Sequence, residues 1–255
     1  MKTIAGRAAW ALKKEIRYLF SFPRPGKILF EHLPKCGGSS LAAYFAEQYP
    51  RRKIFCTDGD NPQPSVDEFK RYPQKKRYGY DLVEGHLAHE LIEYVHPDSL
   101  KITVFREPVE RIISHYYYVK REKKHYLHAE VTADGMSLAE YVSSGLSEEL
   151  HNWYTTHFSG MTDADAEQNP QKSVAKAVET VRKTYDIVGF LDAFDEFAEK
   201  VRRTAHLKRQ YKDRRENVTR DRPKYADVPE TTIRKIEEFN RLDIVFYRKI
   251  RALLA

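Results

Sequence analysis

The sequence predicts an α/β fold, a single domain whose central parallel sheet is covered by helices on both faces. Five short apolar, β-branched or aromatic runs predict buried strands, since strands of a parallel sheet are apolar on both sides. These runs are residues 27–33, 52–57, 80–85, 101–106 and 185–190. Helical patterns separate the runs, and this alternation is typical of a parallel sheet. The 255 residues fit one large domain better than two independent ones.

Composition limits the classes of function. The chain is 41% hydrophobic, which excludes wholesale disorder. Its formal net charge is +7, which favours an anionic ligand such as nucleic acid, acidic lipid, a nucleotide or an acidic polysaccharide. Cys36 and Cys56 are the two cysteines, and they do not form a disulfide framework. No Cys/His cluster has the spacing of zinc ligands, so no metal is expected.

The predicted helices follow from apolar periodicity and from the prolines that open them. Four of them are residues 39–49, 108–122, 170–184 and 192–206. Apolar residues recur from Pro229 to Leu254 at helical spacing, which predicts one long closing helix. Residues 57–65 are rich in turn formers and residues 208–229 are rich in charge, so both stretches predict loops.

Residues 1–22 are basic and partly apolar, and they predict a helix that packs on its own domain. The longest apolar run there is too short for a signal peptide, and no run in the chain is long enough to span a membrane. These observations predict a cytoplasmic protein without a transmembrane segment, and they are compatible with peripheral contact between this helix and a membrane.

The stretch HLPKCGGSS, which follows the first predicted strand, has the composition of an anion-binding loop. Gly37 and Gly38 allow close approach of the backbone, and the following helix directs the positive end of its dipole at the loop. Ser39 and Ser40 add hydroxyl donors, and Lys35 adds a mobile charge. The Walker arrangement, with its lysine after the glycines, is absent. The stretch therefore predicts an anion site of another kind, or a ligand-free turn.

A second stretch, KITVFREPVERIISHYYY, fits a further phosphate. Arg106 ends a predicted strand, Pro108 opens a helix, and Ser114 lies about two turns into it. An arginine binds two phosphate oxygens at once, and a hydroxyl can add a third contact. Arg111 shares a helix face with Ser114 and could support it. A surface arginine before an ordinary helix is the alternative.

Together and in this order, the two stretches resemble the nucleotide site of sulfotransferases that use 3′-phosphoadenosine 5′-phosphosulfate (PAPS). HLPKCGGSSL resembles the family's 5′-phosphosulfate loop, and FREPVERIISHYYY resembles its 3′-phosphate segment, with Arg106 and Ser114 in the matching places. The most similar subgroup contains heparan sulfate 2-O-sulfotransferase and bacterial carbohydrate sulfotransferases. Cys36 departs from the family's usual threonine, which removes one hydroxyl donor but keeps a backbone N–H.

Other segments strengthen the resemblance, and together they extend it from about residue 27 to residue 250. They are VEGHL (83–87), HNWYTTHFSG (151–160), YDIVGFLDAFDEF (185–197) and the C-terminal stretch 216–247. The resemblance implies one sulfotransferase domain over residues 1–255, with a core at about 27–250 and the architecture of P-loop nucleotide kinases.

The resemblance implies a mechanism in which an acceptor hydroxyl attacks sulfur in line with the departing 5′-phosphate. Lys35 would neutralise charge on the bridging oxygen, helped by the backbone amides of residues 37–40. His86 is the predicted general base, because histidine titrates near neutral pH and Gly85-His86 matches the family's Gly-His pair. Three neighbours are rival bases: His89, Glu84 and His32.

The resemblance also implies the ligands. Lys35, Cys36, Gly37, Gly38, Ser39 and Ser40 would bind the phosphosulfate. Arg106 and Ser114 would bind the 3′-phosphate, and the basic loop 208–224 would cover the nucleotide through Asn217 or Arg222. The partners implied are PAPS, its product 3′-phosphoadenosine 5′-phosphate (PAP) and a hydroxyl-bearing acceptor, a glycan or glycolipid. Neither a metal nor nucleic acid is expected.

Three other functions are weaker alternatives. A related kinase or ATPase would need a Walker lysine and magnesium ligands. A non-enzymatic nucleic-acid binder would interleave basic and aromatic residues, as residues 114–126 do in part. A metal-dependent glycosyltransferase would use an Asp-x-Asp pair, which occurs within residues 162–166.

Overall fold

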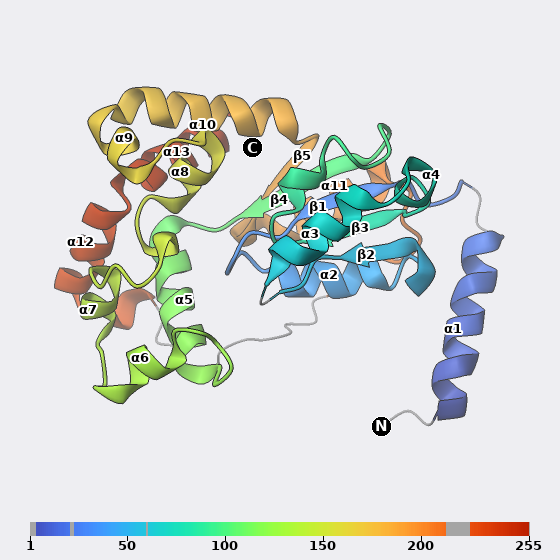
Figure 1. Cartoon of the computed structure of the whole chain (residues 1–255), viewed down its shortest axis with the longest axis horizontal. Helices are drawn as coiled ribbons and strands as arrows, with labels where there is room; N and C mark the ends of the chain where they lie inside the picture. Colours follow the sequence, from blue (N-terminus) through green and yellow to red (C-terminus); the bar gives the residue numbers. More distant parts are fainter. Residues whose placement is uncertain (1–3, 21–22, 60, 213–224, 255) are drawn as a thin grey trace. The chain divides into compact units, whose positions relative to one another are not determined.

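The computed structural model describes residues 4–20, 23–59, 61–212 and 225–254. The chain forms two compact units. Unit 1 contains Met1–Val104 and Tyr185–Asn217, and unit 2 contains Phe105–Thr184 and Val218–Ala255. Figure 1 labels the elements along the chain.

Unit 1 is built on the predicted sheet. Within the described residues, the sheet has five strands in the order β2-β3-β1-β4-β5. The strands are β1 (Ile28–Glu31), β2 (Ile54–Cys56), β3 (Leu82–Gly85), β4 (Leu100–Phe105) and β5 (Ile187–Phe190). β1 pairs in parallel with β3 and with β4, and β2 pairs in parallel with β3. Four predicted runs contain one strand each, and β4 begins one residue before its predicted run 101–106, so the five strand predictions are confirmed.

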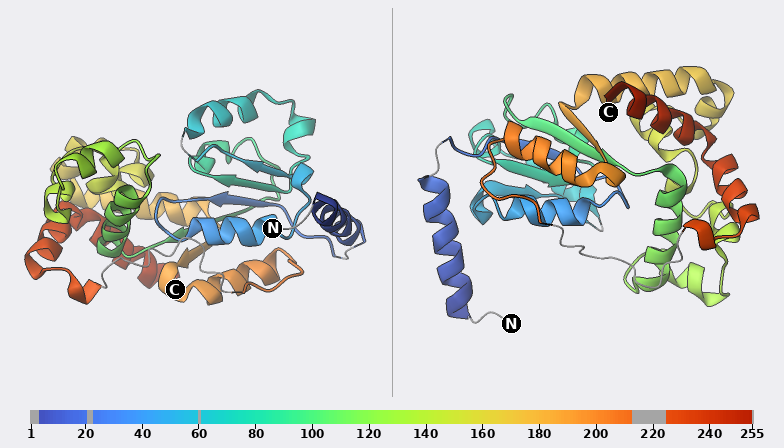
Figure 2. Two further views of the ribbon diagram at one scale, coloured as in Figure 1. Left: turned by 90° about the horizontal axis from the view of Figure 1, so that it is seen from below. Right: turned by 180° about the vertical axis from the view of Figure 1, so that it is seen from behind.

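Helices cover both faces of this sheet, as predicted (Figure 2). The helical elements of unit 1 are α1 (Ile4–Leu19), α2 (Gly38–Ala46), η1 (Arg51–Lys53), α3 (Pro62–Arg71), α4 (Gln74–Arg77), η2 (Ala88–Leu91), η4 (Leu191–Ala193) and α11 (Phe194–Thr204). Successive residues of β1 point to opposite faces. Leu29 shares a buried cluster with Phe69 of α3, whereas the ring of Phe30 packs edge-on against Phe45 of α2. The alternation of β1 therefore fixes the side of the sheet on which each helix lies.

α1 packs on unit 1 through polar contacts near its C-terminal end. The hydroxyl of Tyr18 donates to the buried carboxylate of Asp81, and Lys14 donates to the carbonyl oxygen of Ala46. Arg52 forms an ion pair with Glu15 at 2.8 Å. The prediction that this helix packs on its own domain is confirmed for unit 1. In the part of the chain that the structure describes, no helix combines the length and the apolar character that crossing a membrane requires.

Unit 2 is helical. Its elements are α5 (Pro108–Arg121), α6 (His128–Ala133), α7 (Leu138–Val142), η3 (Glu148–Leu150), α8 (Trp153–Ser159), α9 (Asp163–Gln168), α10 (Pro170–Thr184), η5 (Tyr225–Asp227), α12 (Glu230–Phe239) and α13 (Arg241–Leu254). One buried cluster joins α5, α6, α7 and α12, with Ile112, Tyr141 and Ile236 fully buried in it.

Two local predictions are wrong. The closing helix is divided into α12 and α13 at Asn240, because the Asn240 amide donates to the carbonyl oxygens of Ile236 and Leu150 and caps α12. The predicted loop 57–65 already contains the start of α3. Pro62 occupies the first position of α3, where a proline costs no hydrogen bond.

Segment 151–160 and the closing helices bind each other through buried caps. The carboxylate of Asp243 accepts from the N–H groups of Tyr154 and Thr155 at 2.9 and 2.8 Å, which caps the N-terminus of α8. In return, the amide oxygen of Asn152 accepts from the N–H of Leu242 at 2.8 Å. Burial raises the pKa of Asp243 above its usual range. The hydrogen bonds between segment 151–160 and α13 therefore stabilise unit 2.

Candidate functional site

The strand order predicts a ligand site at the carboxyl end of β1. From β1 the chain continues to β2 and β3 on one side and later to β4 on the other. In open α/β sheets, ligands bind outside the carboxyl ends of strands at such a reversal. The segments that leave β1 and β3 there contain Lys35 and His86.

The loop after β1 has an unusual backbone. Lys35 has φ 63° and Gly37 has φ 79°, both in the left-handed region. A non-glycine residue at such an angle is strained, and strain of this kind concentrates at functional sites. Gly37 is the N-cap of α2 and offers no side-chain cap to the helix. The loop thus combines a lysine with the amino end of a helix, an arrangement that can bind an anion.

Close packing explains both glycines of the loop. A Cβ atom on Gly38 would lie 1.8 Å from the His32 ring, and one on Gly37 would lie 2.6 Å from Leu191. No side chain fits at either position without movement of these neighbours. The glycines therefore fix the loop against the end of β1 and against the residue that follows β5.

We expect Gly38→Ala to lower the free energy of unfolding by about 1–3 kcal/mol, since an added methyl must displace the His32 ring. Denaturant titration measures this change. Gly59→Ala is the control, because a Cβ on Gly59 meets nothing within 4 Å. Equal stability of the two variants would contradict the packing seen at the loop.

The remaining loop residues differ in their surroundings. Cys36 is 1% exposed, its N–H donates to the Leu33 carbonyl at 3.3 Å, and its thiol lies 3.4 Å from the Pro34 carbonyl oxygen. The backbone donor expected of Cys36 is thus engaged within the turn. Ser39 is exposed on the first turn of α2, and Ser40 is half-buried beside it.

His86 is held in one tautomer. Its Nδ1 lies 2.6 Å from the carbonyl oxygen of His32, and that oxygen can only accept, so Nδ1 carries the proton. The neutral ring then has its lone pair on Nε2, as a general base requires. The hydroxyl of Thr57 donates to the His86 carbonyl at 2.7 Å. A Cβ on Gly85 would lie 2.2 Å from that hydroxyl, so glycine is needed there.

His32 joins the loop to His86. Its ring stacks on the His86 ring with centroids 4.5 Å apart, and it also contacts Gly38. Burial, followed by the nearby His86, lowers the pKa of His32 to about 3. His32 is therefore neutral near pH 7, and its uncharged ring packs between Gly38 and the His86 ring.

We expect this histidine to make unit 1 sensitive to acid. The unfolded chain binds a proton near pH 6.5 that folded His32 rejects down to about pH 3. The free energy of unfolding then falls as the pH drops below 6.5, by at most about 1.4 kcal/mol per pH unit from this group. Urea titrations across this range should show a flatter slope for His32→Gln. His206→Gln, at an exposed position of unit 1, should keep the parent slope.

Glu31 and His89 form a second pair at the same edge. Glu31 ends β1 and is 1% exposed, and its carboxylate accepts from the backbone N–H of His89 and from the His89 ring Nδ1, the latter at 3.0 Å. Burial by itself lowers the pKa of His89, but the hydrogen bond and charge of Glu31 outweigh it and raise the pKa. Leu87, at φ 57°, makes the turn that brings His89 back to β1.

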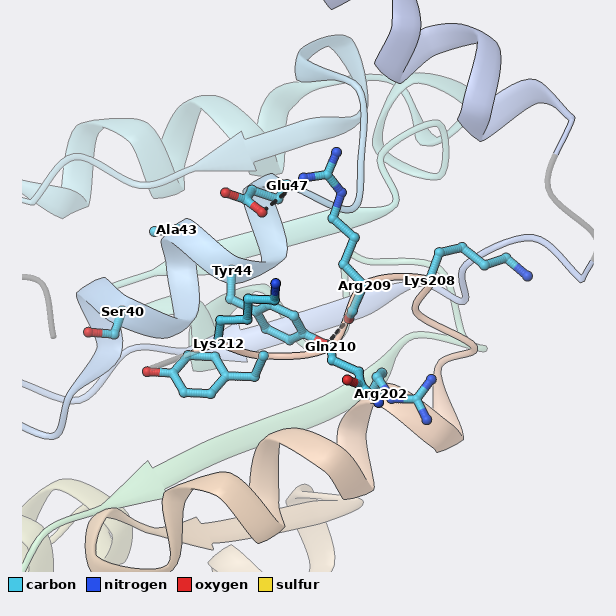
Figure 3. A pocket seen from close by; sticks show the side chains of 10 residues that line it. Ser40, Ala43, Tyr44, Glu47, Arg202, Lys208, Arg209, Gln210 and Lys212 are labelled. Carbon is cyan, nitrogen blue, oxygen red and sulfur yellow. Dashed lines mark hydrogen bonds and ion pairs between the residues drawn. The ribbon is translucent and has the colours of Figure 1, made fainter. Parts of the chain in front are cut away.

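A cavity of about 550 Å³ lies along α2 (Figure 3). It is lined by Ser40, Ala43, Tyr44, Glu47, Arg202, Lys208, Arg209, Gln210, Tyr211 and Lys212. Four of these are cations and one is a carboxylate, so the cavity suits an anion. Ser40 belongs both to this lining and to the glycine loop.

Segment 208–212 contacts α2 and the C-cap residue of that helix through a hydrogen bond and an ion pair. The Tyr44 hydroxyl donates to the Arg209 carbonyl at 2.8 Å, and the Arg209 guanidinium pairs with Glu47 at 3.1 Å (Figure 3). The Tyr211 ring packs edge-on against Tyr44 and Phe194, with centroids 5.6 and 5.0 Å away. The cavity thus has an aromatic wall and a cationic rim. Asn217 and Arg222 lie outside the described residues.

In unit 2, Arg106 and Ser114 flank the start of α5. The Arg106 guanidinium donates to Glu110 at 2.9 Å, which orients it along the first turn. Its backbone N–H and carbonyl both bond to the Tyr154 hydroxyl, at 3.3 and 3.1 Å. Ser114 is half-buried on α5.

Arg111 has a structural role. It is fully buried in unit 2 and donates to the Glu149 carbonyl at 2.6 Å. Its guanidinium also lies over the rings of Trp153 and Tyr154, 5.3 and 4.9 Å from their centroids. Its packing therefore supports the segment between η3 and α8.

The Asp-x-Asp pair of residues 162–166 belongs to a helix terminus. Thr162 caps α9 and its hydroxyl bonds to Asp165 at 2.7 Å, while Asp163 pairs with His151 at 2.7 Å. Both aspartates are engaged by neighbouring side chains within unit 2.

The sequence did not predict the cavity along α2 or the pair formed by Glu31 and His89. Tyr44 and Arg209 are 165 residues apart, and no local pattern links them. Glu31 could have been noticed as an acidic residue at the end of an apolar strand, since a buried carboxylate needs a partner.

Comparisons with known proteins agree with the predicted family. The model of the "Sulfotransferase family" matches residues 18–249. The structure of the mouse sulfotransferase SULT7A1 complexed with PAP is similar at a TM-score of 0.45 and 15% identity, over 93% of this chain and 71% of that one. A sulfotransferase from Alicyclobacillus acidocaldarius gives 0.45 and 15%, over 90% and 96%. A search of curated proteins finds no match.

Proposed function

The chain belongs to the sulfotransferase family, and on that premise we propose that it transfers a sulfuryl group from PAPS to a hydroxyl of a carbohydrate or glycoconjugate. We propose further that residues 1–255 act as one catalytic domain. One observation carries the proposal: the lysine-glycine loop and an oriented histidine base lie at adjacent strand ends of unit 1, joined by the His32 ring.

The proposed reaction is an in-line displacement at sulfur. The acceptor oxygen forms a bond to sulfur while the bond from sulfur to the bridging oxygen of the 5′-phosphate breaks. Nε2 of His86 accepts the hydroxyl proton, since its Nδ1 is fixed on the His32 carbonyl. Lys35 and the amide groups at the start of α2 neutralise the charge that develops on the leaving phosphate. PAP and the sulfated acceptor are the products.

We assign the cavity along α2 to the nucleoside part of the donor. Ser40 connects the cavity to the loop that would bind the phosphosulfate. The Tyr44 and Tyr211 rings, which pack edge-on against each other, offer aromatic surface against which a base can pack, and the surrounding cations suit a nucleotide. Segment 208–212 forms part of this wall, which supports the expectation that the basic loop covers the nucleotide.

The 3′-phosphate is assigned to Arg106 and Ser114 on their sequence motif. We expect Arg106→Lys to weaken PAP binding by about tenfold or more, because an ammonium group cannot form the bidentate hydrogen bonds to a phosphate that a guanidinium forms. Binding of adenosine 5′-phosphate, which lacks the 3′-phosphate, should change little. Isothermal titration of both ligands measures this difference. Equal weakening of the two ligands would contradict the assignment.

A carbohydrate acceptor is supported by the resemblance of the loop and the Gly-His segment to carbohydrate sulfotransferases and by the net charge of +7. A transfer assay with labelled PAPS and a panel of glycans, glycolipids and phenols tests it. Sulfation of phenols without any glycan product would exclude the carbohydrate acceptor while leaving the sulfuryl transfer itself supported.

The donor is tested by thermal stabilisation with PAP, compared with ATP plus magnesium, with and without a chelator. We expect PAP to raise the Tm and the chelator to have no effect on this rise. A rise with ATP that depends on magnesium, together with none for PAP, would favour a kinase or ATPase and overturn the proposal.

A further inference from the structure

α1 presents an apolar stripe that unit 1 does not bury. Leu12, Ile16 and Phe20 are four residues apart, so they line one side of the helix, and they are 61%, 48% and 84% exposed. Lys14 and Tyr18, which contact the rest of unit 1, lie on another side. Three large apolar side chains therefore remain in solvent along one line.

The sequence of α1 is basic. The sequence of α1 contains four cationic residues and one acid: Arg7, Lys13, Lys14, Arg17 and Glu15. The acid, Glu15, is paired with Arg52. Lys13, Arg24 and Arg51 are exposed, and the charges of Arg24 and Arg52 both act on Tyr18 at the C-terminal end of the helix. The stripe therefore belongs to a basic helix with exposed cations close to it in sequence, Lys13 directly after Leu12 and Arg24 four residues after Phe20.

The exposed apolar stripe and the basic sequence of α1 favour an anionic bilayer over a second copy of the chain as the partner of this surface. A second copy of the chain would bring two basic helices together, which like-charge repulsion disfavours. In an anionic bilayer, the lipid phosphate groups can pair with the cations of α1, and the acyl chains can bury the apolar stripe. Trp10, which is 40% exposed with Lys14 5.1 Å from its ring, is a residue type that favours the bilayer interface.

We propose that α1 lies in the surface of anionic membranes, with the stripe of Leu12, Ile16 and Phe20 inserted at the headgroup boundary and Lys13 and Arg24 on lipid phosphates. The helix has 16 residues, which is too few to span a bilayer, so the contact is peripheral. The inference concerns a surface of unit 1 and does not depend on the proposed reaction.

Cosedimentation of the full chain with vesicles tests the proposal. We expect binding to vesicles of equal parts phosphatidylcholine and phosphatidylglycerol, weaker binding at higher salt, and little binding to pure phosphatidylcholine. The triple variant Leu12→Gln, Ile16→Gln, Phe20→Gln should lower the partition coefficient by about tenfold or more. The variant Lys13→Glu, Arg24→Glu should lose the preference for anionic vesicles.

The matched control is Val245→Gln with Leu253→Gln, two apolar residues of α13 that are 43% and 61% exposed. It should bind vesicles as the parent chain does, and all variants should retain the parent Tm. The absence of binding to anionic vesicles overturns the proposal, as does equal loss of binding in the control. A dimer in light scattering that the triple variant dissociates would identify a second copy as the occupant, and this too would overturn it.

Discussion

Replacing Lys35 with alanine is expected to lower turnover by about 10²–10³-fold, the range found when one donor to a developing oxyanion is removed. The ammonium group is proposed to neutralise the leaving 5′-phosphate, and the Lys35 backbone has φ 63°. A coupled assay of PAP release measures turnover. Lys200→Ala, an exposed lysine of α11, is the control and should keep parent activity.

A second substitution separates chemistry from stability. Lys35→Gly removes the same ammonium group but relieves the left-handed strain, which should make it more stable than Lys35→Ala by about 1 kcal/mol. Both variants should nevertheless be equally slow. If Lys35→Gly recovered turnover along with stability, the lysine would have a structural role only.

His86→Gln is the second variant with a large expected effect, a loss of about 10²–10⁴-fold in turnover. An amide cannot accept the acceptor's proton, whereas its shape lets it remain beside the His32 carbonyl. The thermal shift with PAP should stay close to that of the parent, because His86 is proposed to act on the acceptor. Single-turnover rates with labelled PAPS measure the chemical step.

His89→Gln is the informative comparison for His86. His89 lies in η2 of the same unit, and Glu31 holds its ring Nδ1, so it is the best-oriented rival base. We expect a much smaller loss for this variant than for His86→Gln. The reverse order of losses would transfer the role of base to His89, with Glu31 as its orienting carboxylate.

The strands and the loop could be predicted from sequence because their signals are local. Residues such as Leu29 and Val83 are apolar because both faces of the sheet are covered, and a run of them identifies a strand. Gly37 and Gly38 are required by close contacts, and they follow directly after the strand that they pack against. These local patterns do not predict the order of the five strands, because that order depends on which distant segments pair.

Other features depend on contacts between distant parts of the chain. The break at Asn240 requires the carbonyl oxygen of Leu150, 90 residues earlier, as a second acceptor. The neutrality of His32 depends on burial and on His86, which the order of residues does not reveal. The helical start at Pro62 is hidden within residues 57–65, which are rich in turn formers, because proline suits both a turn and a first helical position.

The close contacts at the glycine loop also determine how this enzyme could be redesigned. A mutant library across the loop would lose most members at Gly37 and Gly38, where a methyl group already collides with Leu191 or His32. Ser39 is exposed, and Ser40 borders the cavity, so substitutions there meet open space. If the loop binds the donor as proposed, changes of donor preference are therefore expected to arise at Ser39 and Ser40 and not at the two glycines.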